Sequence, residues 1–158
     1  MIKNFMTNWL YEGKEVTSIE ELPQDSFGFI YIVIHIPSKR AYIGKKSLYH
    51  NIKRKLTKKE LAEQTGPGRK PTSKVVSKES DWKTYFGSAK PVQALIKEGK
   101  QDEFKREILK IVNNKKLLTY YECKYLFMMG VLEYPKSYFN DNILGKFFTR
   151  DFGVANED

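Results

Sequence analysis

Polar and apolar residues alternate in two neighbouring stretches of the chain, and this pattern predicts a β-hairpin. Residues 28–36 form a β-branched run, a turn-forming segment follows at 37–40, and a shorter apolar run occupies 41–44. Alternate side chains of a strand point to opposite faces. We therefore expect one apolar face, the core face, to be formed by Ile30, Ile32, Ile34 and Ile36.

Tyr31 and Tyr42 are predicted to share the other face of this hairpin. Ile43 has to join the core, which leaves Tyr42 on the opposite face together with Tyr31. The two phenols should then converge and point outward, and Gly44 should let the backbone approach a ligand or a neighbouring helix closely. The alternative is that both residues are ordinary strand aromatics, which β-propensity alone would favour.

The segment after the hairpin mixes charged and apolar residues at loosely helical spacing. This spacing predicts a helix from residue 45 to residue 62, and the Gly/Pro-rich segment 66–71 predicts a basic loop after it. A second helix is expected with Ser88 as its cap and Pro91 in its first turn, ending at Gly99.

Two further elements complete the predicted fold. Residues 104–112 have the length and β-branched content of a third strand. Residues 117–129 are apolar on several sides, as in a buried helix, and Gly130 is its expected end. The predicted fold class is α/β of the α+β kind, with a small, three-stranded, mainly antiparallel sheet flanked by helices.

The chain of 158 residues fits one compact domain. We expect an N-terminal extension packed on the core at 1–26, the main domain at 27–145, a basic insertion around 53–80, and a C-terminal tail at 146–158. Oligomeric state, monomer or homodimer, is left open by the sequence.

Charge narrows the class of partner. The formal net charge is +9, and nine Lys or Arg stand between Lys53 and Lys78 against two acidic residues. A positive potential of this kind concentrates polyanions such as nucleic acid or acidic membranes. A basic protein with no such partner is the alternative.

Other classes of site are disfavoured. The single Cys123 cannot form an internal disulfide, and with His35 and His50 as the only histidines no zinc-ligand spacing occurs. No apolar run has the length of a membrane span. We therefore expect a cytoplasmic, intracellular protein with no membrane partner and no zinc.

The paired tyrosine motifs resemble the core of the GIY-YIG nucleases, which are named for two short strand motifs. Here Phe29-Ile30-Tyr31 is followed, eleven residues after its tyrosine, by an intact Tyr42-Ile43-Gly44, and Phe29 stands where the family has glycine. The resemblance spans residues 28 to about 140. The Asp-Trp-x-x-Tyr-x-Gly-Ser segment at 81–88 resembles small phage-encoded proteins, which would place the chain in the cytoplasm of a host cell.

Glu122 is the candidate metal ligand. On a helix it neighbours Leu118, Tyr125 and Leu126, so its charge lies within an apolar stripe where a bound cation would offset the cost of burial. The alternative is a capping box formed by Thr119 and Glu122 at a helix start.

The resemblance also implies a phosphate-contacting arginine and a late asparagine. Arg54, twelve residues after Tyr42, is the only arginine on the predicted helix, with Lys46 and Lys53 as substitutes. A solvated basic face is the alternative for Arg54, and His50 is expected to be a surface residue. Asn140 resembles the family's asparagine that orders the site, the alternative being a turn-forming residue.

Together these residues imply a metal-dependent DNA endonuclease whose catalytic set is Tyr31, Tyr42, Arg54, Glu122 and Asn140. In the implied one-metal mechanism Tyr31 helps to deprotonate the attacking water, and Glu122 holds Mg²⁺ or Mn²⁺. A free phenol titrates near ~10, so Tyr31 would need cations beside it. DNA contacts are expected from Lys45, Lys46, Lys53, Arg69, Lys70 and Lys74. The alternative is a catalytically inactive nucleic-acid-binding protein on the same fold.

Overall fold

The structure, a computed structural model, describes residues 7–153. The chain divides into two compact units, one formed by residues up to 48 together with those from 81 on, and one formed by residues 49–80. Each unit is described by itself. Within residues 7–153, no helix is both long and apolar enough to cross a bilayer.

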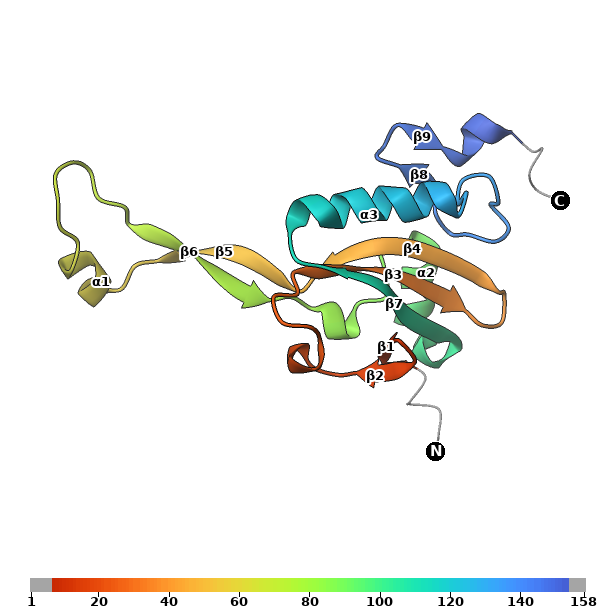
Figure 1. The fold of residues 1–158 in the computed structure, drawn as a ribbon, viewed down its shortest axis with the longest axis horizontal. Helices are drawn as coiled ribbons and strands as arrows, with labels where there is room; N and C mark the ends of the chain where they lie inside the picture. Colours follow the sequence, from red (N-terminus) through yellow and green to blue (C-terminus); the bar gives the residue numbers. More distant parts are fainter. Residues whose placement is uncertain (1–6, 154–158) are drawn as a thin grey trace. The chain divides into compact units, whose positions relative to one another are not determined.

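The larger unit is built on a five-stranded sheet of order β2-β1-β7-β3-β4 (Figure 1). Its strands are β1 Trp9–Tyr11, β2 Lys14–Val16, β3 Gly28–His35, β4 Arg40–Ser47 and β7 Phe104–Val112. Strand β3 lies between β4 and β7 and pairs antiparallel with both, so the three predicted strands are confirmed.

The prediction of only three strands was wrong. The N-terminal extension adds two strands to the sheet, β2 antiparallel to β1 and β1 parallel to β7. Trp9 anchors this addition, because its side chain is 1% exposed and its indole donates a hydrogen bond to the Trp82 carbonyl at 2.6 Å. A strand of three residues is too short for an alternation pattern to identify it.

Two helices belong to the larger unit. In α2 Lys90–Lys97, Pro91 lies in the first turn as predicted, but Ala89 and not Ser88 is the N-cap residue. The longer α3 Lys115–Met128 begins at the N-cap Asn114, whose side chain accepts from the Leu117 amide at 2.8 Å. The predicted ends are confirmed, since both helices are followed by glycines of positive φ, Gly99 and Gly130.

Short elements complete this unit. They are the 3₁₀ turns η2 Ile19–Glu21, η3 Trp82–Thr84, η4 Gln101–Glu103 and η5 Thr149–Phe152, and the small ribbon of β8 Asn142–Ile143 with β9 Phe147–Phe148.

Strand β3 is buried on both faces, which corrects the expected division into a core face and an outward face. Ile30 packs beneath α3, in a cluster with Ile43 and Leu118, as the pattern predicted. The opposite face is buried as well, because Phe29, Tyr31 and Val33 are 0%, 1% and 0% exposed. Along the isoleucine row only Ile30 is buried, whereas Ile32 and Ile34 are partly exposed and Ile36 is 44% exposed. A central strand covered on both faces is apolar on both, so alternation could not show which side is the core.

The smaller unit is a two-stranded antiparallel ribbon of β5 Tyr49–Lys55 and β6 Ser73–Glu79 (Figure 1). The helix predicted over 45–62 was wrong, since only α1 Lys58–Ala62 is helical. Thr57 starts that helix with a capping box, in which its hydroxyl accepts from the Glu60 amide and the Glu60 carboxylate accepts from the Thr57 amide. The preceding residues form a strand because β6 supplies a pairing partner that lies far along the chain.

Candidate active site

The two motif tyrosines converge, as the strand alternation predicted. Their ring centroids are 6.2 Å apart, and the register pairs Tyr42 with Val33 and Tyr31 with Gly44 across the hairpin. Residues paired across two strands share a face, so Tyr42 lies on the same face as Val33 and Tyr31. The expectation that both point outward was wrong for Tyr31, which is fully buried.

Gly44 makes room for the Tyr31 phenol. A Cβ at this position would lie 2.5 Å from the Tyr31 hydroxyl oxygen and 3.0 Å from the Tyr42 ring. The close neighbour of this glycine is therefore the first motif's tyrosine, where a ligand or a helix had been expected. The glycine of the second motif and the tyrosine of the first fit together as one packing unit.

The segment from Tyr85 to Ser88 covers the tyrosine pair. Tyr85 packs edge-on against Tyr31 with ring centroids 5.9 Å apart, and the Ser88 hydroxyl is hydrogen-bonded to the Tyr42 hydroxyl at 2.7 Å. Gly87 adopts a φ of +104°, and a Cβ there would lie 3.0 Å from the Tyr42 ring. No role at the tyrosine pair was predicted for this segment from the sequence, although Gly87 next to Ser88 was a signal of close backbone approach.

Arg106 holds this covering segment in place and was not identified from the sequence. Its guanidinium, on β7, donates to the carbonyls of Lys83 at 3.0 Å and Tyr85 at 2.7 Å. The side chain is 3% exposed and lies against the rings of Trp9 and Phe86. Burial lowers its pKa to about 10, so it remains charged at neutral pH. An arginine at a core-facing position of a strand was the available signal.

Glu122 lies on α3, within the apolar stripe that the sequence predicted. Leu118 and Leu126, one turn away on either side, are both buried. Burial raises the pKa of the Glu122 carboxyl, and the neighbouring Lys45 ammonium acts in the opposite direction. The capping-box alternative was wrong, because α3 begins at Lys115 and places Thr119 and Glu122 beyond its first turn.

Lys45 joins the YIG strand to this helix. Its Nζ donates to the Thr119 hydroxyl at 3.1 Å and lies 3.7 Å from Glu122 Oε1. The next residue, Lys46, places its Nζ 4.0 Å from the centroid of the Tyr85 ring and 2.5 Å from the Asp81 carboxylate. Lys45 therefore lies next to the candidate metal ligand Glu122, and Lys46 lies next to Tyr85, which packs against Tyr31.

A polar hollow of about 230 Å³ brings the predicted residues together. Tyr42 and Glu122 line it, and Ser88, Asn140 and Asp141 are also in its wall. Tyr31 does not line the hollow and is 1% exposed.

Asn140 holds the YIG strand from its edge. The side-chain Oδ1 accepts from the Ile43 amide at 3.1 Å, and Nδ2 donates to the Ile43 carbonyl at 2.8 Å. This amide therefore imitates a neighbouring strand, and its bonds reach across 97 residues of sequence. The turn-forming alternative does not describe these bonds, which fix the backbone beside Tyr42.

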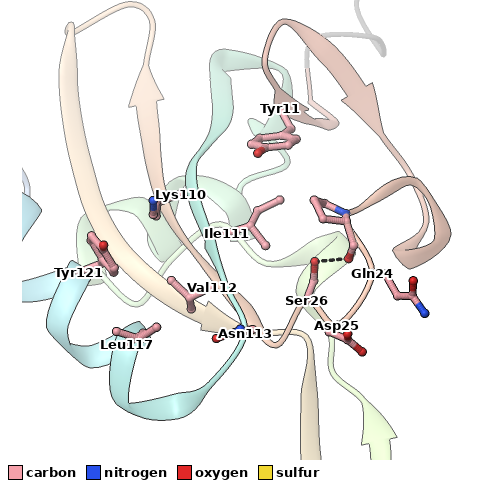
Figure 2. Close-up of a pocket in the computed structure, with 11 residues that line it drawn as sticks. Tyr11, Gln24, Asp25, Ser26, Lys110, Ile111, Val112, Asn113, Leu117 and Tyr121 are labelled. Carbon is pink, nitrogen blue, oxygen red and sulfur yellow. Dashed lines mark hydrogen bonds between the residues drawn. The ribbon is translucent and has the colours of Figure 1, made fainter.

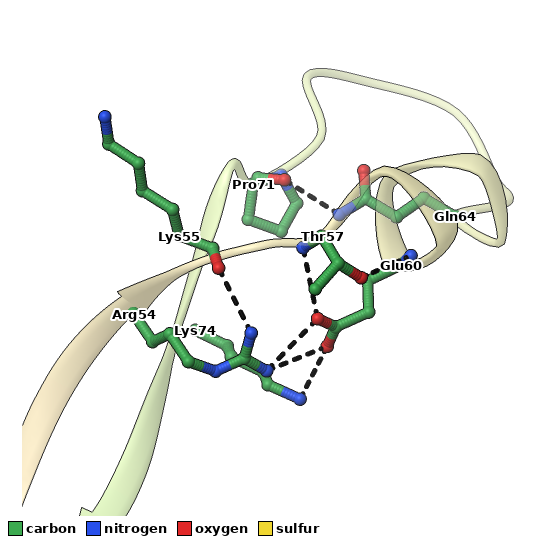
Figure 3. Close-up of polar contacts among 7 residues, drawn as sticks. All are labelled: Arg54, Lys55, Thr57, Glu60, Gln64, Pro71 and Lys74. Atoms are coloured by element: carbon green, nitrogen blue, oxygen red, sulfur yellow. Dashed lines mark hydrogen bonds and ion pairs between the residues drawn. The ribbon is translucent and has the colours of Figure 1, made fainter.

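Arg54 belongs to the ribbon and not to a helix, which corrects the placement expected from the sequence. Its Nη2 donates to both carboxylate oxygens of Glu60, at 3.1 and 3.2 Å, and Lys74 Nζ lies 2.6 Å from the same carboxylate (Figure 3). The guanidinium is thus engaged within residues 49–80. The ribbon also contains Lys53, Arg69 and Lys70, and His50 is exposed there as predicted.

The residues around the hollow fit a hard divalent cation. Glu122 supplies a half-buried carboxylate, and Asp141 lines the same wall. Across residues 7–153 no group of three or more His, Cys, Asp or Glu side chains is arranged to hold a metal. Mg²⁺ retains several waters and binds through one or two carboxylates together with phosphates, so a single protein carboxylate suits it.

A second hollow, of about 320 Å³, lies beside the end of β7 and the start of α3 (Figure 2). Lys110 is the one cation in its wall, and Tyr11, Leu117 and Tyr121 contribute apolar surface. None of the predicted catalytic residues lines it. We therefore place the candidate active site at the hollow that Tyr42 and Glu122 share.

The mixed fold and the packed tyrosine motifs define a GIY-YIG domain. A family model described as "Putative endonuclease segE, GIY-YIG domain" matches residues 9–143. This match covers most of the chain, so the protein belongs to that family, within the GIY-YIG endonuclease superfamily. No curated protein and no solved structure matches the chain.

Proposed function

We propose that this protein is a metal-dependent DNA endonuclease with its active site at the hollow between β4 and α3. One observation carries the proposal: Tyr42 and Glu122, far apart in the sequence, line the same hollow, and Lys45 contacts Glu122. The family supplies the nuclease class. The net charge of +9 supports a polyanionic substrate.

Lys45 and Lys46 are the cations that we assign to the scissile phosphate, in place of Arg54. Both follow the YIG motif directly. Lys45 lies beside Glu122, and Lys46 lies over the ring of Tyr85, which packs against Tyr31. Arg54 belongs to the unit of residues 49–80, whereas the residues that line the hollow belong to the larger unit. A lysine ammonium neutralises phosphate as a point charge without the bidentate fork of an arginine.

Tyr42 is the phenol that we assign to the attacking water or the phosphate. It lines the hollow, whereas Tyr31, which the family resemblance implied as the proton acceptor, is 1% exposed. Burial raises the pKa of both phenols, and the nearby Tyr85 and Glu122 raise it further. Both hydroxyls are therefore protonated at neutral pH, where they donate hydrogen bonds. Tyr31 then serves to position Tyr42.

Glu122 is the residue that would hold Mg²⁺ or Mn²⁺, which stabilises the leaving oxygen in this class of reaction. The assignment rests on a carboxylate that is half-buried and lies in the same wall as Tyr42. Asn140 acts indirectly, since its amide fixes the strand that carries Tyr42 and Ile43.

Supercoiled plasmid tests the proposal. Purified protein should nick it in Mg²⁺ and not in EDTA, and Glu122→Gln should bind the plasmid without nicking it. Nicking by the Glu122 variant at the wild-type rate would overturn the assignment.

The engagement of Arg54 by Glu60 favours one other candidate function, a nucleic-acid-binding protein that lacks catalysis. Such a protein would bind the plasmid and yield no product in any divalent metal, so the same assay distinguishes the two.

A further inference from the structure

The ribbon of residues 49–80 concentrates the charge of the chain. It contains nine Lys or Arg against three acidic residues, in a protein whose whole net charge is +9. None of its residues is buried. An isolated two-stranded ribbon without a hydrophobic core is marginally stable in water. Binding to a partner would stabilise a segment of this kind, and its positive charge favours an anionic partner.

Ion pairing divides the cations of the ribbon into two groups. Arg54 and Lys74 lie directly opposite each other in the β5–β6 register, where their like charges would repel. The Glu60 carboxylate bridges them (Figure 3). The hydrogen bond from Lys74 is the main reason that the pKa of Glu60 falls to about 2. Arg54 and Lys74 are therefore both ion-paired with Glu60, and this contact connects the two strands to α1.

The second group surrounds an open hollow. Lys53, Arg69 and Lys70 line a hollow of about 390 Å³ together with Pro71, Thr72 and Ser73. Within residues 7–153 these three cations have no ion-pair partner. The side chains of Lys, Arg, Ser and Thr donate hydrogen bonds to phosphate oxygens in protein–DNA complexes. The three cations and the hydroxyls of Thr72 and Ser73 therefore form a set of donors suited to a nucleic-acid backbone.

We propose that the ribbon is a DNA-binding arm, in which Lys53, Arg69 and Lys70 hold the phosphate backbone of duplex DNA and Glu60 braces Arg54 and Lys74. The inference rests on the proposed function for its substrate class. Seven-residue strands extend about 23 Å, and a two-stranded ribbon fits the major groove of B-form DNA, about 12 Å wide. Contacts of this kind are independent of base sequence.

The test compares two triple variants of the full chain by fluorescence anisotropy with a labelled duplex. One is Lys53→Gln, Arg69→Gln, Lys70→Gln; the control removes the same charge at exposed sites of the larger unit, Lys14→Gln, Lys97→Gln, Lys136→Gln. The arm variant should bind at least about tenfold more weakly and lose about 2 to 3 from the slope of log affinity against log salt. The control should change by less than about twofold. Equal losses, or no loss in the arm variant, would overturn the inference.

Two further measurements separate this inference from the proposed function. The first repeats the anisotropy in EDTA, where the proposed function gives no nicking and the arm variant should still bind duplex more weakly than wild type. If wild type binds through the arm but never nicks, the proposed function fails and the inference stands. Anionic phospholipid vesicles provide the opposing outcome, because tighter binding to vesicles than to duplex would make the partner a membrane surface.

Discussion

The ammonium of Lys45 lies 3.7 Å from the carboxylate of Glu122, and this contact joins the YIG strand to α3. It brings a residue beside the second tyrosine motif next to the candidate metal ligand. Lys45 also partly offsets the effect of burial, which raises the Glu122 pKa.

This contact predicts the acid side of the pH–rate profile. Because the Glu122 pKa is raised, its carboxylate becomes protonated, and loses metal, at a higher pH than an ordinary glutamate near ~4.3. Lys45→Gln removes a group that lowers this pKa, so it should move the acid limb to still higher pH. Lys124→Gln, an exposed residue of the same helix, is the control and should leave the limb in place. The measurement is the nicking rate as a function of pH, with Mn²⁺ affinity as a second readout. An acid limb at the same pH in Lys45→Gln and wild type would refute the effect of Lys45 on the Glu122 pKa.

The packing of Tyr31 against Gly44 predicts a stability cost for any side chain at residue 44. Gly44→Ala would place its Cβ 2.5 Å from the Tyr31 oxygen, and overpacking of this kind costs about 1–3 kcal/mol. Removing that oxygen with Tyr31→Phe in the same chain should recover part of the loss. Urea denaturation measures both. Gly44 does not have a positive φ, so the loss in Gly44→Ala reports packing and not backbone strain. Equal free energies of unfolding for Gly44→Ala and wild type would contradict the packing.

Arg106 is predicted to act as a positioning residue for the segment that covers the tyrosines. Arg106→Leu leaves the carbonyls of Lys83 and Tyr85 without their donor, and should destabilise the protein by about 2–4 kcal/mol. Arg106→Lys keeps the positive charge but removes the planar guanidinium that donates to both carbonyls. It should stay folded, yet the single-turnover rate should fall while DNA affinity is retained. A rate and affinity that fall in parallel in Arg106→Lys would argue for a purely structural role.

Glu60 provides a pH test of the ribbon. Its carboxyl pKa is held at about 2 in the folded chain, below the value of about 4.3 in an unfolded one. A depressed pKa stabilises the folded ribbon above pH ~4.3, and this contribution is lost as the pH falls through about 2. An NMR titration of the Glu60 carboxyl in wild type and in Lys74→Gln measures it, and the Glu60 pKa should rise in the variant because its largest lowering contact is removed. An equal Glu60 pKa in the two proteins would contradict the bridge between Arg54 and Lys74.

The shared face of the two tyrosines and the position of Glu122 could be predicted because each follows from the spacing of apolar residues within one local segment. Strand alternation placed Tyr31 and Tyr42 on one face, and helical spacing placed Glu122 between Leu118 and Leu126. The burial of Tyr31 could not be predicted in the same way, since its cover comes from Tyr85 on a distant segment.

The ribbon and the edge of the sheet were missed for a related reason. Residues 49–55 form a strand only because residues 73–79 pair with them, and their charges also suit a helix. Strand β1 is three residues long and depends on β7 for a partner. Pairing between distant segments leaves no periodic signal in either one, and so Arg54 was expected on a helix.

Single-turnover cleavage of a duplex in Mg²⁺ is the most direct test of the proposed active site. Wild-type protein is compared with Tyr42→Phe and Glu122→Gln at enzyme concentrations that saturate the DNA. Both variants should bind the duplex as wild type does and cut it at least about 100-fold more slowly. Cleavage at the wild-type rate by either variant would contradict an active site built on Tyr42 and Glu122.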